Sequence, residues 1–188
     1  MSLEKSFDDI NETDIRQLIE DQISERKTIE YKLTLPDNKY DSKKEFLADV
    51  SSFANAVGGH LLYGIKAENG IPVEITGVSN SDLDGEILRL ENLLRDNIQA
   101  RIQGVSVRAV NIESRNPVLV IRVPPSWLKP HVVNFQGHWR FYARNSAGKY
   151  PLDVLELKSA FLASSELGEK IRNFHINRIS KVIWVRFI

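Results

Sequence analysis

The sequence predicts a mixed α/β fold (α+β, mixed sheet), in which helices pack on a sheet whose strands need not all be parallel. Two periodicities carry this prediction. Apolar residues recur at helical spacing in segments such as 42–57, and apolar and polar residues alternate in segments such as 28–35. The predicted order is α-β-α-β-β-α-β-β-β-α. The 188 residues suffice for one main domain, which we assign to residues 1–164 with its core at about 15–164.

The first helix is predicted to begin after Asn11 or Thr13, either of which can cap it, and to run to about Gln22. A half-buried strand follows over residues 28–35, because apolar side chains occupy one face and polar side chains the other. Pro36 then breaks this strand.

Ser42 and Glu45 have the spacing of a capping box, which predicts a second helix that continues to a left-handed cap at Gly58. The remaining elements follow from the same two periodicities. We expect strands at 61–65, 71–75, 105–112, 118–123 and 138–144, a helix over 82–102, and a further helix from Leu152 or Asp153.

Charge and composition exclude several kinds of site. Lys plus Arg and Asp plus Glu both number 25, so any anion-binding surface must be a local one. The absence of cysteine excludes disulfides and thiolate zinc sites. The sequence has no leader-like start and no run approaching about 18 apolar residues. We therefore expect a cytoplasmic protein with no membrane partner.

Two carboxylates and a lysine lie close together around the first predicted strand. Glu30 and Lys32 share its polar face, and Glu25 lies just before it. Such a group is suited to holding Mg²⁺ or Mn²⁺ and orienting water at a phosphodiester, with Glu68 or Glu74 as a third carboxylate. An ordinary solvated face predicts the same residues, since Glu and Lys are common at exposed positions. Spacing alone leaves both interpretations open.

Asn55, Gly58 and Gly59 are candidate phosphate-binding residues at the end of the second helix. Paired glycines allow a left-handed turn and the close approach of backbone amides to an anion. A tight helix-to-strand turn explains them equally well. Neither this turn nor Gly148-Lys149 has a Walker signature, so ATP binding is an alternative that no motif supports.

Arg140, Tyr142 and Arg144 alternate along a predicted strand and therefore project from one face, with Lys149 close in sequence. The cations suit contact with phosphates, and Tyr142 suits stacking on a base. An exposed outer sheet face explains the pattern nearly as well.

Four blocks of sequence, in this order, resemble the Schlafen-type AlbA-like domain. They are Glu25-(four residues)-Glu30-Tyr31-Lys32, the block from Phe53 to Ile65 with its paired glycines, the block from Asn69 to Gly77, and Phe141-Tyr142-x-Arg144-x-Ser146. The resemblance covers roughly residues 15 to 180. It implies an AlbA-like fold found in bacterial proteins that are often labelled DNA-binding proteins, transcriptional regulators or divergent ATP-binding proteins.

For the Schlafen nucleases that share this domain, the resemblance implies metal-dependent cleavage of RNA by three acidic residues. Glu25 and Glu30 match the first two. Lys66 stands where the third acid is expected, and Glu68 is the nearest carboxylate. A lysine repels the cation that such a site holds, so this departure weakens the case for catalysis.

The leading hypothesis is a nucleic-acid-binding domain, for DNA or RNA, with a regulatory role. The alternatives are a nuclease that depends on Mg²⁺ or Mn²⁺ and uses Glu25, Glu30, Lys32 and Glu68, and a nucleotide-binding assembly module. We expect residues 165–188 to form a helical extension that begins a further region. Its apolar end, residues 182–188, is a candidate surface for joining copies into a homo-oligomer.

Overall fold

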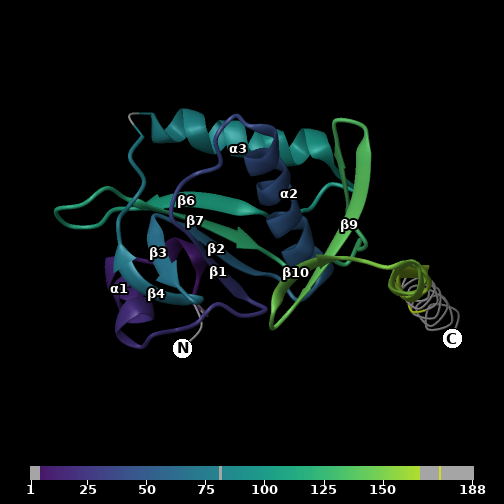
Figure 1. The fold of residues 1–188 in the computed structure, drawn as a ribbon, viewed down its shortest axis with the longest axis horizontal. Coiled ribbons are helices and arrows are strands. Elements are labelled where there is room, and N and C mark those ends of the chain that lie inside the picture. Colours follow the sequence, from purple (N-terminus) through teal and green to yellow (C-terminus); the bar gives the residue numbers. More distant parts are fainter. Residues whose placement is uncertain (1–4, 81, 166–173, 175–188) are drawn as a thin grey trace, which may run out of the picture.

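The computed structural model describes residues 5–80, 82–165 and 174 (Figure 1). Within these residues, two four-stranded sheets and one two-stranded sheet combine with helices that cover both faces of the first sheet. The first sheet contains both parallel and antiparallel pairs. The predicted mixed α/β class is therefore confirmed.

The first sheet has the strand order β1-β2-β7-β6. Its strands are β1 (Ile29–Lys32), β2 (Gly59–Tyr63), β7 (Val118–Val123) and β6 (Ser106–Val110). Strands β1 and β2 are parallel, with Glu30 opposite Leu61, whereas β7 runs antiparallel to both β2 and β6. The parallel pair needs a crossover, and helix α2 (Tyr40–Asn55) supplies it.

The second sheet is antiparallel and has the order β10-β9-β8-β5. Its strands are β10 (Gly148–Pro151), β9 (His138–Asn145), β8 (Val132–Phe135) and β5 (Ile98–Gln99). Strands β3 (Ile65–Glu68) and β4 (Ile71–Ile75) form the small third sheet. In Figure 1 the β8–β9 hairpin stands at one end of the molecule, beside α3 (Leu83–Asn97).

Two hydrophobic clusters lie on opposite faces of the first sheet. Helices α2 and α3 pack Phe46, Phe53 and Leu90 against one face. Helix α1 (Glu12–Glu20), which follows the short 3₁₀ helix η1 (Phe7–Asp9), packs Ile15 and Leu18 against the other. Because Ile29 and Tyr31 of β1 face α1, the alternating Glu30 and Lys32 face α2.

The helices partly follow the sequence predictions. Asn11 caps α1 through a capping box with Asp14, as expected for one of the two candidate caps. The predicted capping box of Ser42 and Glu45 is wrong. Helix α2 already begins at Tyr40, and the Glu45 side chain pairs with a lysine instead. Helix α3 ends at Asn97, five residues early, because β5 leaves it to pair with β8.

The strands at 71–75 and 118–123 are confirmed, whereas β3, β5, β8 and β10 were not predicted as strands. Gly64, with a φ of +91°, separates β2 from β3 and packs against the backbone of Gly77. A further helix occupies residues 154–165, as expected from Leu152 or Asp153. The predictions for 182–188, and for most of 165–188, lie outside the described residues. No helix in the described ranges is long and apolar enough to span a membrane.

Candidate functional site: a partly buried charge cluster beside a cleft

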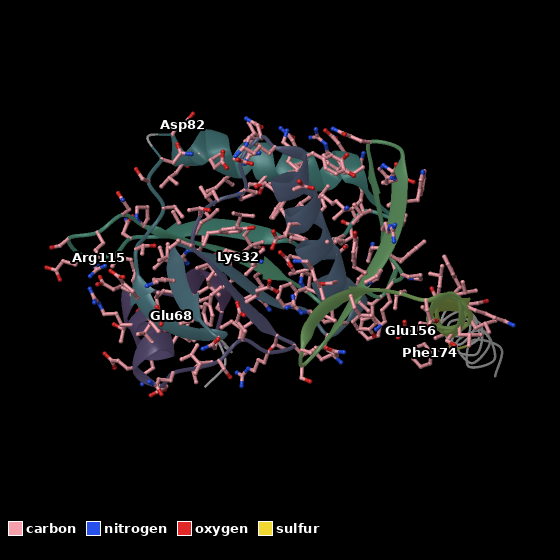
Figure 2. All side chains as sticks on the ribbon, viewed as in Figure 1. Lys32, Glu68, Asp82, Arg115, Glu156 and Phe174 are labelled. Carbon is pink, nitrogen blue, oxygen red and sulfur yellow. The ribbon has the colours of Figure 1, made fainter. Side chains whose placement is uncertain are left out.

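Six charged side chains meet where β1, α2, β9 and β10 converge, and we call them the charge cluster. Its acids are Glu30, Glu45 and Asp49, and its bases are Lys32, Arg144 and Lys149. The alternation of β1 points Glu30 and Lys32 toward α2, and the second and third turns of α2 present Glu45 and Asp49 to them. Figure 2 labels Lys32 near the middle of the view, beside α2.

Lys32 lies among the three acids. Its Nζ donates to Glu45 Oε1 at 2.6 Å, pairs with Glu30 Oε1 at 2.9 Å, and lies 3.5 Å from Asp49 Oδ2. That last contact is an ion pair without a hydrogen bond, since Asp49 Oδ2 has no hydrogen-bond partner. Lys149 Nζ donates to the other oxygen, Asp49 Oδ1, at 2.6 Å. The cluster therefore joins strand β10 to helix α2.

Arg144 is the most enclosed cation of the cluster, with 4% of its surface exposed. Its Nη2 donates to Glu30 Oε2 at 2.5 Å, and its guanidinium carbon lies 3.6 Å from the centre of the Phe53 ring. A cation over an aromatic face is attracted by the ring quadrupole, more strongly where water is excluded. Three acids and three bases thus neutralise one another, with Asp49 and Arg144 buried and Glu45 at the surface.

The pKa values of the cluster reflect burial and mutual attraction. Burial, together with the charge of Glu30, raises the pKa of Asp49 from 3.8 to about 6, although Lys149 and Lys32 oppose the rise. For Glu30 burial acts upward too, but Lys32 and Arg144 outweigh it and leave its pKa below the usual value. Burial acts to lower the pKa of Lys32, and the carboxylates around it, Asp49 first, raise it instead.

A cleft of about 560 Å³ opens beside the cluster. The turn between β3 and β4 lies on one side of it, and the turn between β9 and β10 lies on the other. Its lining residues are Glu25, Arg26, Glu30, Asn69, Gly70, Arg144, Ser146, Ala147, Gly148 and Lys149. Glu25 and Glu30, predicted to act together, do line the same cleft. Glu25 Oε1 accepts a hydrogen bond from the backbone N–H of Tyr31 at 2.9 Å.

The family model described as "Schlafen, AlbA_2" matches residues 25–153, which include β1, α2, both turns of the cleft and the whole charge cluster. The chain belongs to the Schlafen AlbA_2 family. This confirms the resemblance seen in the four sequence blocks. No curated protein sequence matches the chain.

Two solved structures resemble the fold of this Schlafen AlbA_2 chain. The N-terminal domain of a Nitrosomonas europaea protein, named as related to the ATP-dependent DNA helicase RecG, has 21% identity and a TM-score of 0.52. That match covers 72% of this chain and 88% of the other. The DIP2311 protein of Corynebacterium diphtheriae has 18% identity and a TM-score of 0.48. This match covers 74% of the present chain but only 27% of DIP2311, so the chain spans about a quarter of that protein.

The donor set does not fit the divalent metal that Schlafen nucleases imply. Both oxygens of Glu30 are engaged by Lys32 and Arg144. Glu68, labelled in Figure 2, lies at the end of β3 and pairs with Lys66 at 2.9 Å. It is not among the residues that line the cleft. In the part of the chain that the structure describes, no three acidic or histidine side chains are grouped to hold a metal. Lys32 and Arg144 already neutralise the Glu30 carboxylate, which a metal ion would need as a ligand.

Asn55 and the paired glycines have structural contacts. Asn55 Nδ2 donates to the carbonyls of His131 and Tyr142 at 3.0 and 2.8 Å, and its Oδ1 accepts from the His131 N–H at 2.7 Å. A Cβ on Gly58 would lie 2.6 Å from the backbone nitrogen of Pro125, and one on Gly59 would lie 2.5 Å from the Phe53 ring. Close packing accounts for both glycines without a ligand.

The four residues predicted to bind nucleic acid do not form one exposed strip. Arg140 is exposed, but Arg144 is buried, and Lys149 is half-buried against Asp49. Tyr142 packs against the core that α2 helps to form. Tyr142 and Arg144 both lie against α2, so they share a face of β9 as expected. At this end of β9, however, that face is in the interior and not on the surface.

Asp49 is a cluster residue that the sequence analysis missed. It is fully buried, and it lies on α2 between Phe46 and Phe53, within the stripe of apolar residues. Buried aspartates are rare unless they are paired. An acidic residue in the middle of an apolar helical stripe was the signal that could have identified it.

Proposed function

We propose that this Schlafen AlbA_2 chain is a nucleic-acid-binding domain and that binding does not require a divalent metal. The observation that carries the proposal is the distribution of charge along the sequence. Residues 114–152 contain no Asp or Glu but six Lys and Arg, although the whole chain is balanced at 25 of each sign. This segment includes β7, β8, β9 and β10.

Three of these six cations are available to a ligand. Arg144 and Lys149 pair within the charge cluster, and Arg115 lies 3.4 Å from Glu74. Arg122, Lys129 and Arg140 are exposed, and none of them has an ion-pair partner among the described residues. Unpaired surface cations are the groups that contact phosphates and supply sequence-independent affinity. The name of the RecG-related structure, which refers to a DNA helicase, agrees with this proposal.

Fluorescence anisotropy with labelled single- and double-stranded DNA and RNA tests the proposal, first at low salt and then over a salt series. We expect binding in the presence of EDTA. The affinity should fall as salt rises, because binding releases counterions from the nucleic acid and added salt opposes that release. The Arg122→Gln/Arg140→Gln variant should show a shallower salt dependence. Arg95→Gln is the matched control, since Arg95 pairs with its neighbour Asp96. Absence of binding to all four probes at low salt would overturn the proposal.

A further inference from the structure

An apolar groove of about 860 Å³ lies between the helix at 154–165 and the loop after β7. Among the described residues that line it, Lys129 is the only charged one. Trp127 lines it with 77% of its surface exposed, and Val57, just after α2, is about half exposed. Exposed apolar side chains grouped in a groove are typical of a surface that another group covers.

The helix at 154–165 forms one wall of this groove and is attached to the second sheet. Phe161 packs edge-on against Phe141 of β9 with ring centres 5.8 Å apart, and Glu156 accepts a hydrogen bond from the Tyr150 hydroxyl at 3.0 Å. The residues that the helix contributes to the groove are all small, namely Ser159, Ala160, Ala163 and Ser164. The groove therefore has room for bulky side chains between this small-residue wall and Trp127.

The sequence that continues from this helix contains a segment of matching chemistry. Residues 182–188 read Val-Ile-Trp-Val-Arg-Phe-Ile, so every side chain except that of Arg186 is apolar. Contact between this segment and an apolar wall is favourable, because it removes apolar surface from water on both sides. Trp184 is the largest of these side chains and suits a groove whose opposite wall is made of small residues.

The covalent connection favours this segment over a separate molecule. Ser164 lines the groove, and only the 17 residues 165–181 lie between it and Val182. A chain of 17 residues spans at most about 60 Å, so the segment stays in the neighbourhood of the groove. A short connection of this kind gives an effective concentration on the order of millimolar, at which a modest intrinsic affinity is enough for docking.

We propose that residues 182–188 dock in this groove of their own chain, with Trp184 between Trp127 and the small-residue wall. The groove is then an interaction surface that the chain covers itself, and a partner protein reaches it only by displacing the segment. This inference does not depend on nucleic-acid binding, because it uses none of the cations assigned to phosphates except Lys129, which borders the groove.

Engineered cysteine pairs test the docking directly, because the chain contains no cysteine. Ser159→Cys/Val185→Cys places one thiol in the groove wall and one in the segment. Ser165→Cys/Val185→Cys is the matched control, since Ser165 is exposed on the same helix but does not line the groove. With diamide as oxidant, the first variant should form an intrachain disulfide at least about tenfold faster. Chance encounter favours the control, whose loop is shorter.

Tryptophan quenching gives a second measurement that does not depend on disulfide geometry. In the Trp127→Phe/Trp139→Phe background, Trp184 is the one tryptophan left of three, and acrylamide should quench it less than in urea. Adding Ser159→Arg puts a bulky charge in the groove wall and should raise the quenching toward the urea value. Adding Ser165→Arg should leave it unchanged. Circular dichroism verifies that each variant is folded.

Three outcomes would overturn the inference, and they are distinguishable. Equal rates of disulfide formation in the two cysteine variants, with Trp184 quenched as freely as in urea, would mean that the segment does not dock. Protected Trp184 that Ser159→Arg leaves protected would mean that it docks elsewhere. A disulfide that joins two chains, seen as a dimer on a non-reducing gel, would assign the groove to the segment of a second copy.

Discussion

Arg144 of the second sheet packs on Phe53 of α2: the guanidinium carbon lies 3.6 Å from the ring centre, and Nη2 donates to Glu30. The positive charge is buried, so its stability depends on the ring below and the carboxylate beside it. Arg144 Nε and Nη1 have no hydrogen-bond partner. The contact with Phe53 and the pair with Glu30 therefore hold the β9–β10 hairpin in position at the cleft.

Replacing Arg144 by Met should destabilise the fold, because Glu30 would keep a buried charge with one partner fewer. Removing one member of a buried ion pair costs about 3–5 kcal/mol. Urea unfolding measures the change, and the exposed Arg140→Met is the control, expected to stay within about 0.5 kcal/mol. The double variant Glu30→Gln/Arg144→Met should lose less than the sum of the single losses. A double-variant loss equal to the sum of the two single losses would show that the pair is not coupled.

Asp49→Asn should change how stability depends on pH. Since the pKa of Asp49 rises from 3.8 to about 6 on folding, the folded protein binds more protons than the unfolded chain between these values. Stability therefore falls as pH rises through this window. Relative to Asp49→Asn, wild type should lose about 2 kcal/mol between pH 4 and pH 7, since each pKa unit is worth about 1.4 kcal/mol and part of the window lies below pH 4.

Chemical unfolding at a series of pH values gives this difference curve. The lowered pKa of Glu30 acts in the opposite direction, with stability lost in acid, but Glu30 is present in both proteins and its contribution largely cancels. A wild type that gains stability over Asp49→Asn as pH rises would mean that Lys149 and Lys32 outweigh burial and lower the pKa of Asp49.

Gly58→Ala and Gly137→Ala should separate backbone strain from close packing, since both glycines have positive φ angles. A Cβ at position 58 would lie within 2.7 Å of Pro125 and of the Val123 carbonyl, whereas a Cβ at position 137 would meet nothing within 4 Å. Gly137→Ala should cost about 1 kcal/mol, and Gly58→Ala about 2–4 kcal/mol. Thermal unfolding compares them, and equal costs would remove the packing explanation.

The local pattern of apolar residues predicted the elements in which these residues form a stripe or an almost uninterrupted run. Strand β7 and helix α1 follow directly from apolar spacing, and so does the shared polar face of Glu30 and Lys32. Strands β5 and β8 were missed because they are short and are fixed by pairing with each other, which no local pattern records.

The site depended on contacts between distant parts of the chain. Arg144 is 114 residues from Glu30, and Lys149 is 100 residues from Asp49. Alternation placed Arg144 on one face of its strand but gave no sign that Phe53 would cover this face. The family blocks identified the domain, whereas the pairing of each carboxylate required the packed structure.

Asn55→Ala should distinguish a structural role for Asn55 from a phosphate-binding role. The change removes three hydrogen bonds to the backbone of His131 and Tyr142, and leaves those groups without partners. We expect a loss of at least about 2 kcal/mol in urea unfolding, compared with about 0.5 kcal/mol or less for the exposed Asn38→Ala. Nucleic-acid binding by folded Asn55→Ala, measured well below its Tm, should equal that of wild type. Unchanged stability with lost binding would contradict the structural role and favour a phosphate contact at the α2–β2 turn.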